Sequence, residues 1–183
     1  MARVVYLETP RLRLGQLTPD DLDALFQLDQ DPEVMRYLGG RSTPFEDVRD
    51  RALPAMLAFH AKGPDYGFWA AEDRATDAFL GWFHFRPPHD ADVPGIELGY
   101  RLARAAWGQG LATEGSRAII ARGFGELGVK RICAKTLTTN LASRRVMEKC
   151  GLAFEREFME HRLDPPAPAV WYAITRDAWR PPG

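Results

Sequence analysis

Residues 107–115 read WGQGLATEG and place two glycines, Gly108 and Gly110, where a strand-like segment gives way to a helix-like one. Glycine lets backbone approach a ligand without interference from a Cβ atom. The start of a helix presents unpaired N–H groups and the positive end of the helix dipole. The main-chain amides from Gly108 to Thr113 can therefore converge on an anion such as a diphosphate.

Two familiar phosphate-binding motifs do not fit this stretch. A P-loop needs Lys followed by Ser or Thr after its last glycine, but Leu111 and Ala112 follow Gly110. A dinucleotide-binding fingerprint needs a small third residue where Thr113 stands, and it needs a βαβ unit at the start of the chain. On these residues alone, a tight turn that binds nothing is an equal alternative.

Composition limits the classes of function. The 183 residues are 45% hydrophobic, which fits one domain with a sizeable core. A net charge of -1 disfavours nucleic acid as a partner. Without a signal peptide or an apolar stretch long enough to span a bilayer, we expect a cytoplasmic protein with no membrane partner. The spacing of Cys133, Cys150 and the four histidines predicts no metal site.

The segment before the glycines predicts helices followed by strands. RLRLGQL alternates like a half-buried strand, and Thr18 is placed to cap a following helix. A second helical region covers about residues 44–61, where Pro54 should kink or divide it. YGFWAAED and AFLGWFHFRP then predict an antiparallel hairpin, and GIELGYRLA predicts a further strand.

The segment after the glycines alternates between helix and strand. A helix is expected over about residues 109–127 with Gly128 as its stop, followed by the strand KRICAKTLT. NLASRRVMEKCG predicts a short helix capped by Asn140. LAFEREFMEHRL, a proline-rich loop at residues 165–168 and AVWYAITRDAW close the chain. The whole pattern predicts a mixed α/β domain.

The order IELGYRLARAAWGQGLATEG, LGVKRICAKTLTTNLASRRVMEKCGLAFE resembles the GNAT superfamily of acyl-CoA-dependent N-acetyltransferases, in particular its RimJ/RimL-type branch. The resemblance runs from ETPRLRLGQLTPDD to VWYAITRDAW and so implies a single domain over residues 1–183. It implies a mostly antiparallel central sheet with splayed middle strands, flanked by helices. Trp107 stands where the superfamily has Arg or Gln, which puts in doubt only a side-chain contribution to the loop.

The resemblance also implies acetyl-CoA as co-substrate, lying between GIELGYRL and RICAKTL. Main-chain groups of the first strand would pair with the pantetheine arm, and Asn140 would hydrogen-bond it. Ser143 would approach the sulfur as proton donor. The implied cofactor-binding residues are Tyr100, Arg101, Leu102, Gly108, Gln109, Gly110, Leu111, Ala112, Thr113, Asn140 and Ser143.

Acyl transfer to an amine needs a neutral nucleophile and therefore a proton acceptor. A free α-amine titrates at about 7.7 to 8.0, far below a lysine amine at about 10.4. Glu97, in the strand beside the implied thioester, is the candidate base.

Each of these residues also has a structural alternative. Glu97 is equally suited to pairing with an arginine or facing solvent. For Ser143 a solvated first-turn position beside a simple cap is the less favoured alternative. Gly99 marks a place where backbone can bulge or be approached closely, and packing beneath an aromatic ring is its less favoured alternative. For His84, an ordinary hydrogen-bonded strand histidine is favoured over a residue lining the acceptor pocket.

The resulting hypothesis is direct transfer of an acetyl group to a primary amine in a ternary complex. A protein or peptide N-terminus is the favoured acceptor, and a small amine such as an aminoglycoside or polyamine is the alternative. A non-catalytic CoA-binding module is the rival from another class, because fold alone does not fix function. The exposed edges of such a sheet leave room for a homodimer.

Overall fold

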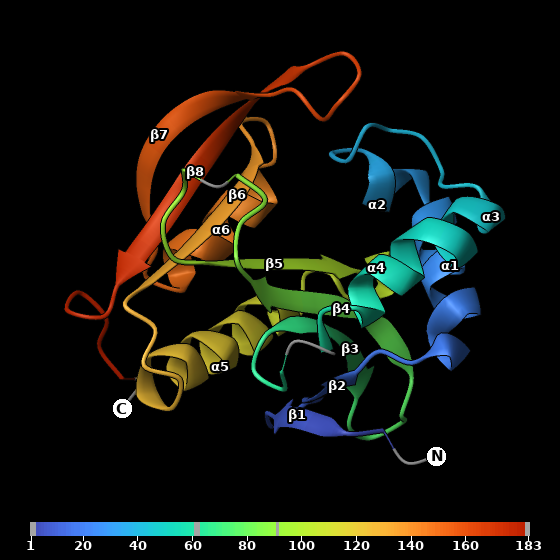
Figure 1. The fold of residues 1–183 in the computed structure, drawn as a ribbon, viewed down its shortest axis with the longest axis horizontal. Helices are drawn as coiled ribbons and strands as arrows, with labels where there is room; N and C mark the ends of the chain where they lie inside the picture. Colours follow the sequence, from blue (N-terminus) through green and yellow to red (C-terminus); the bar gives the residue numbers. More distant parts are fainter. Residues whose placement is uncertain (1–2, 61–62, 91, 182–183) are drawn as a thin grey trace.

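A computed structural model describes residues 3–60, 63–90 and 92–181. One eight-stranded sheet runs through the molecule in the order β1-β2-β3-β4-β5-β6-β8-β7, and only the β5–β6 pair is parallel (Figure 1). The strands are β1 Val5–Glu8, β2 Leu12–Gln16, β3 Gly67–Asp73, β4 Phe79–Arg86, β5 Ile96–Leu102, β6 Arg131–Leu137, β7 Ala153–Glu160 and β8 Ala167–Thr175. The expected mixed α/β fold with a mostly antiparallel sheet is confirmed.

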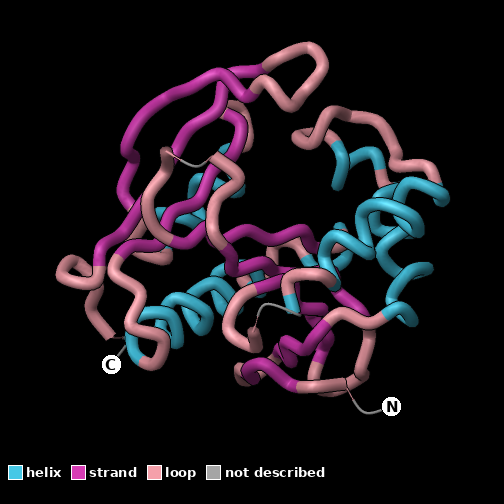
Figure 2. Tube along the Cα trace, in the orientation of Figure 1, coloured by secondary structure: helices cyan, strands magenta, loops and turns pink. Residues whose placement is uncertain are grey.

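Helices flank this sheet (Figure 2). The α-helices are α1 Leu22–Gln30, α2 Pro32–Met35, α3 Phe45–Asp47, α4 Leu53–Leu57, α5 Leu111–Gly125 and α6 Leu141–Lys149. Short 3-10 turns at Pro19–Asp21 and Arg104–Ala106 and a π-helical segment at Val48–Ala52 complete the helical part. No helix in the described ranges is long and apolar enough to cross a membrane.

Side-chain alternation in the strands divides the core between the two faces of the sheet. Phe83 and Phe85 of β4 belong to the large cluster that includes Ile119 and Phe124 of α5. Trp82, which directly precedes Phe83 in sequence, belongs to a second cluster with Leu25 and Leu28 of α1. Successive strand residues point to opposite faces, so β4 and its partner β5 present different chemistry to the two layers of helices.

The expected division of the helix near Pro54 is confirmed. The region expected to be helical from about residue 44 to 61 is divided into α3, the π-helical segment Val48–Ala52 and α4. A proline ring inside a helix clashes with the carbonyl one turn earlier, and a widened π turn is a common local adjustment. The helix ends at Leu57, and residue 61 lies outside the described residues.

Two expected boundaries were wrong. The helix after the glycines ends at Gly125, so Gly128 is not its stop; Gly128 lies in the following loop with φ +66°. The expected proline-rich loop at residues 165–168 ends early, because β8 already begins at Ala167 and Pro168 pairs with Met159 of β7. Pro168 lies beyond the last β6–β8 pair, so its missing N–H costs no hydrogen bond to β6.

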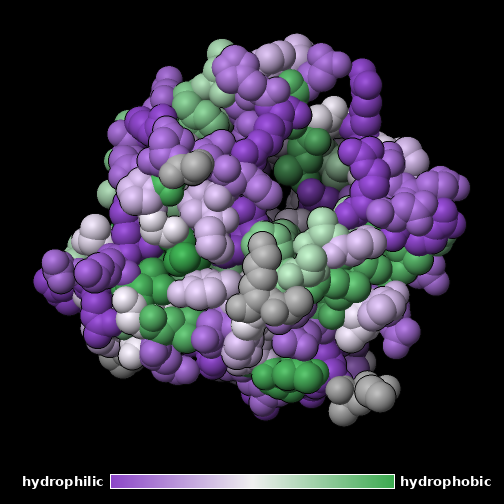
Figure 3. All heavy atoms as spheres, viewed as in Figure 1, coloured by the Kyte–Doolittle hydropathy of each residue, from purple (hydrophilic) through white to green (hydrophobic). Residues whose placement is uncertain are grey.

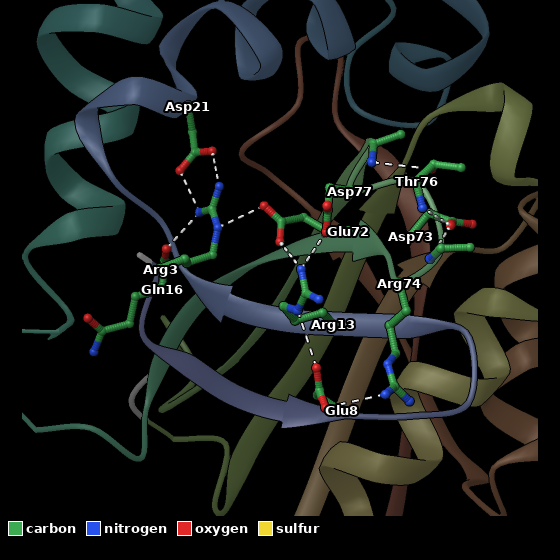
Figure 4. A network of polar contacts seen from close by, with 12 residues as sticks. Arg3, Glu8, Arg13, Gln16, Asp21, Glu72, Asp73, Arg74, Thr76 and Asp77 are labelled. Carbon is green, nitrogen blue, oxygen red and sulfur yellow. Dashed lines mark hydrogen bonds and ion pairs between the residues drawn. The ribbon is translucent and has the colours of Figure 1, made fainter. Parts of the chain in front are cut away.

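An ion-pair network fastens the first strands to the start of the helical section (Figure 4). Arg3 reaches Asp21 at 2.7 Å and Glu72 at 2.9 Å, and Arg13 reaches Asp77 at 2.6 Å. Burial by itself would raise the pKa of Asp21, but the hydrogen bonds from Arg3 and Thr18 outweigh it and lower that pKa. Asp21 is therefore ionised at neutral pH and holds the 3-10 turn against β3.

Helix α5 packs closely on β4 through glycine. A Cβ atom at Gly115 would lie 2.5 Å from Cζ of Phe83, and one at Gly123 would lie 2.8 Å from Cζ of Phe85. Contacts this short exclude any side chain without movement of the helix. The start of α5, and with it the glycine stretch, is therefore held at a fixed distance from the central strands.

Gly115→Ala should destabilise the protein by about 1–3 kcal/mol, since the added methyl group overpacks the helix–sheet contact. Thermal or urea unfolding measures the change. Gly125→Ala in the same helix is the matched control: nothing lies within 4 Å of its Cβ position, so alanine there should leave stability unchanged or raise it slightly. Equal stability of the two variants would contradict this account of α5 packing.

Candidate active site

The central feature of the site is the separation of two neighbouring strands. β5 and β6 pair only through Ile96–Ile132 and Glu97–Cys133 at their first residues. No further β5–β6 pair occurs in the described ranges, so the strands diverge over the rest of their length. The diverging strands form a wedge, and a cleft of about 640 Å³ lies in it. Residues of β5, β6 and the starts of α5 and α6 line this cleft. The surface is hollowed between α2 and the β6–β7 side of the molecule (Figure 3).

The glycine stretch borders one part of this cleft. Gly108 has φ +73° and Gly110 has φ +80°, a left-handed conformation that L side chains rarely adopt. Nothing lies within 4 Å of a Cβ atom at Gly108, so the space beside it is open. Helix α5 begins directly after Gly110, and the amides of its first turn have no preceding helical carbonyl to bind. This local geometry suits an anion.

Two neighbours of the glycines have other partners. The Trp107 indole N–H donates to the Leu102 carbonyl oxygen at 2.8 Å and ties the loop to the end of β5. The Gln109 side chain donates to the Ala105 carbonyl at 2.7 Å, and Gln109 is not among the residues lining the cleft. Trp107 therefore shapes the loop, while the Leu102 carbonyl already accepts a hydrogen bond.

The side chains of Thr9, Arg11 and Glu114 form a polar brace that supports the glycine loop. This brace was not predicted from the sequence. The Glu114 carboxylate accepts hydrogen bonds from the Thr9 hydroxyl at 2.6 Å and from the Arg11 side chain at 2.7 Å. Arg11 also donates to the Gln109 carbonyl at 2.9 Å. Burial opposes ionisation of Glu114, but these hydrogen bonds prevail and lower its pKa. The only sequence signal was an acidic residue in a helix first turn, which is also ordinary dipole stabilisation.

Ser143 and Tyr100 meet across the wedge. The Asn140 side chain caps α6 by accepting the Ser143 N–H at 3.2 Å, as expected. The Ser143 Oγ lies 3.0 Å from the Tyr100 hydroxyl. Burial raises the pKa of Tyr100, so the phenol stays protonated. The sequence assigned Tyr100 a main-chain role; the side-chain contact depends on how α6 packs against β5.

Glu97 lies on the other face of β5. It is 4% exposed, and its carboxylate lies 3.4 Å from Arg86 of β4. Burial raises the pKa of Glu97, while the charge of Arg86 acts in the opposite direction. The ion pair considered from the sequence is thus present, and Glu97 also lines the cleft. Arg101 shares this face, where it pairs with Asp29 and lies over the Trp82 ring.

His84 packs on Gly99. A Cβ atom at Gly99 would lie 2.5 Å from Cε1 of His84, so the packing explanation for this glycine is correct. The expectation of a hydrogen-bonded histidine was wrong, because both ring nitrogens are buried without a hydrogen-bond partner among the described residues. Burial lowers the pKa of His84 well below its usual value, so the imidazole is neutral. His84 therefore lines the cleft as a structural side chain whose ring nitrogens are buried.

The part of the cleft away from the glycine stretch is lined by charged side chains, and two loop segments approach each other beside it. Lys135 of β6 lies 2.7 Å from Glu160, and the two side chains line the cleft together. A Cβ atom at Gly39 would lie 3.8 Å from Leu163, so the segment after α2 and the β7–β8 loop are close to contact.

The two cysteines take no part in the described polar site. Cys133 and Cys150 are free and buried, and burial raises the pKa of their thiols to about 12 and about 11. Within the described ranges, no group of three or more His, Cys, Asp or Glu side chains is arranged to hold a metal ion.

A wedge between parallel strands, followed by an amide-rich loop at a helix start, is the architecture expected of an acyl-CoA-dependent acyltransferase. Residues 11–153 match the acetyltransferase (GNAT) domain family, and the chain belongs to this family of N-acetyltransferases, which use acetyl-CoA.

Relatives and a solved structure agree with this membership. The FsC-acetyl coenzyme A-N(2)-transacetylase of Aspergillus fumigatus is 34% identical, covering 94% of this chain and 77% of its own. Aminoglycoside N(6')-acetyltransferase type 1 of Klebsiella pneumoniae is 28% identical, covering 91% and 84%. RimL, a ribosomal L7/L12 alpha-N-protein acetyltransferase solved with coenzyme A, superposes with a TM-score of 0.76 over 96% of this chain and 99% of its own. Its 19% identity shows a shared fold.

Arg11→Ala should weaken CoA binding about 5- to 10-fold, since it removes two or more hydrogen bonds that hold the loop. Titration calorimetry with CoA measures the dissociation constant. Arg13→Ala is the matched control, because Arg13 is the next arginine in the chain but pairs with Glu8 and Asp77, away from the loop. Equal affinities of the two variants would show that the brace does not support the loop.

Proposed function

We propose that this protein transfers an acetyl group from acetyl-CoA to a primary α-amine by direct attack in a ternary complex. The observation that carries the proposal is the wedge between β5 and β6, which has amide groups at one end and a buried carboxylate on its wall. No nucleophilic cysteine is needed, and both thiols are buried with raised pKa values. The amine therefore attacks the thioester itself.

The donor would lie along the splayed edge of β5. Its diphosphate would accept hydrogen bonds from the amides of residues 108–113, where the helix dipole also favours negative charge. The main-chain groups of residues 100–101 that face away from β4 would pair with the pantetheine arm, because they lie beyond the last β5–β6 pair. Leu102 would contribute through groups other than its carbonyl oxygen, because that oxygen already accepts a hydrogen bond from the Trp107 indole. Asn140 and Ser143 would complete the site from α6.

Glu97 and Ser143 divide the chemistry between the two sides of the wedge. Glu97 would take a proton from the amine, directly or through water, as the C–N bond forms. As the C–S bond breaks, the electron pair stays on sulfur, and the Ser143 hydroxyl would stabilise the departing thiolate. These two residues lie on different elements, β5 and α6, which both line the same cleft.

A protein or peptide N-terminus is the favoured acceptor. Its α-amine titrates at about 7.7 to 8.0 and is partly neutral at physiological pH. The RimJ/RimL-like resemblance of the chain supports the same choice, as does the name of the RimL neighbour.

A small amine is the second candidate, supported by the names of two sequence relatives. One is named for transfer to an N(2) nitrogen and the other for transfer to an aminoglycoside N(6') nitrogen.

Thiol release from acetyl-CoA should depend on an added amine. The panel should contain peptides with free and blocked N-termini, polyamines, and aminoglycosides. We expect release with free N-termini and none with blocked ones, with mass spectrometry showing the acetyl group on the α-nitrogen. Release only with small amines would establish the second candidate. CoA binding without release on any acceptor would instead identify a non-catalytic CoA-binding module.

The rate should rise with pH as the Glu97 carboxyl loses its proton, which gives one limb of the pH profile. Burial raises the pKa of this carboxyl, so its protonated, inactive form persists above pH ~4.5 and is lost as pH increases. Glu97→Gln should lower kcat about 100-fold and remove this limb, while the limb of the amine itself at about 7.7 to 8.0 remains. Profiles of kcat/KM against pH measure both. Exposed Glu157→Gln is the control and should keep the wild-type profile.

A further inference from the structure

Two hydroxyl groups form a pair at the point where the wedge opens. The Tyr100 hydroxyl lies 3.0 Å from Ser143 Oγ and 3.4 Å from the Ser143 carbonyl oxygen. Tyr100 belongs to β5 and Ser143 to the first turn of α6, so the contact spans the two elements on either side of the cleft. Both residues line that cleft.

The other polar groups around the pair restrict what each hydroxyl can do. The Ser143 N–H is committed to Asn140, which leaves the hydroxyl as the only free donor of Ser143. Because burial raises the pKa of Tyr100, its phenol keeps its hydrogen and remains a donor at working pH. Tyr172, a second tyrosine that contacts α6, is bound to Arg144 and Glu148 instead.

We propose that Tyr100 is a positioning residue that donates a hydrogen bond to Ser143 Oγ and thereby directs the Ser143 hydrogen toward the sulfur of CoA. Each hydroxyl has one hydrogen, so a bond from Tyr100 to Oγ leaves the Ser143 hydrogen free to point into the cleft. Consecutive hydrogen bonds polarise one another, which makes Ser143 a better donor to a thiolate. This inference rests on the proposed function, because it assumes that CoA occupies the wedge.

No proton leaves Tyr100 in this arrangement. When the amine attacks, a C–N bond forms and the C–S bond breaks, and the sulfur departs with the electron pair as a thiolate. The chain from Tyr100 through Ser143 stabilises that charge by hydrogen bonding alone, in the manner of donors preorganised around an oxyanion. The proton of the amine goes to the base, and the thiolate is protonated by solvent after release.

The thiol pKa of enzyme-bound CoA tests this directly, without knowledge of the acceptor. The ultraviolet absorbance of the thiolate reports its ionisation as pH is varied. Tyr100→Phe should raise the pKa of the bound thiol by about half to one unit, since it removes one hydrogen bond from the chain. It should also lower kcat about 5- to 10-fold and leave the KM for acetyl-CoA within twofold.

Further variants separate positioning from packing. Ser143→Ala should raise the thiol pKa at least as much, and adding Tyr100→Phe to it should cause no further change, because the two act in series. Ser143→Thr keeps the hydroxyl and should retain a value near that of the wild type. Tyr6→Phe is the matched control and should have no effect, since Tyr6 is a buried tyrosine away from the cleft whose hydroxyl bonds a backbone carbonyl, that of Asp65.

The outcomes distinguish this inference from the proposed function. If the variants bind CoA and Tyr100→Phe leaves the bound thiol pKa unchanged, the positioning role is overturned and the acetyltransferase proposal stands. Additive shifts in the double variant would likewise overturn the chain. If the wild-type protein does not bind CoA, the proposed function itself fails.

Discussion

The site depends on an interrupted hydrogen-bond ladder. β5 and β6 run parallel and pair at Ile96–Ile132 and Glu97–Cys133, then separate. Beyond that point the backbone groups of β5 that face β6 lose their strand partner, while those that face β4 keep theirs, and an unpaired group is costly unless another group or water replaces it. An amide-rich ligand arm can serve as the missing strand. The cleft, the exposed edge of β5 and the approach to the start of α5 all follow from this one break.

Alternation along β5 then divides the chemistry between two faces. Tyr100 points toward α6, where it meets Ser143, while Glu97 and Arg101 point toward the opposite layer and meet charged groups. In the proposed reaction, leaving-group stabilisation and proton removal would thereby be separated by the thickness of one strand. His84 packs against Gly99 and fills the space where a side chain at that position would lie. A shift of register by one residue would exchange the two faces.

Charge near the loop is balanced rather than simply positive. Glu114, one turn into α5, would repel a diphosphate if it were unpaired. Arg11 and Thr9 hold its carboxylate on the side of the β1–β2 turn, and Arg11 also holds the Gln109 carbonyl. The same contacts connect the first strands to the loop. The brace thus links the N-terminal hairpin, itself fastened by the network around Arg3, to the glycine loop before α5.

The sequence alone determined most of the order of elements and the glycine turn, because these follow from local periodicity, capping and glycine. The splayed strands were implied only by the family resemblance, and the short elements β1 and α2 were not predicted. The sequence also predicted that Asn140 caps α6. Arg86 and Glu97 meet because the register of the neighbouring strands β4 and β5 places them opposite each other. Only the tertiary structure brought Tyr100 to Ser143 and Arg11 to Glu114, since each of these pairs joins elements that are distant along the chain. Such contacts depend on how helices pack across a sheet, and no local pattern encodes that packing.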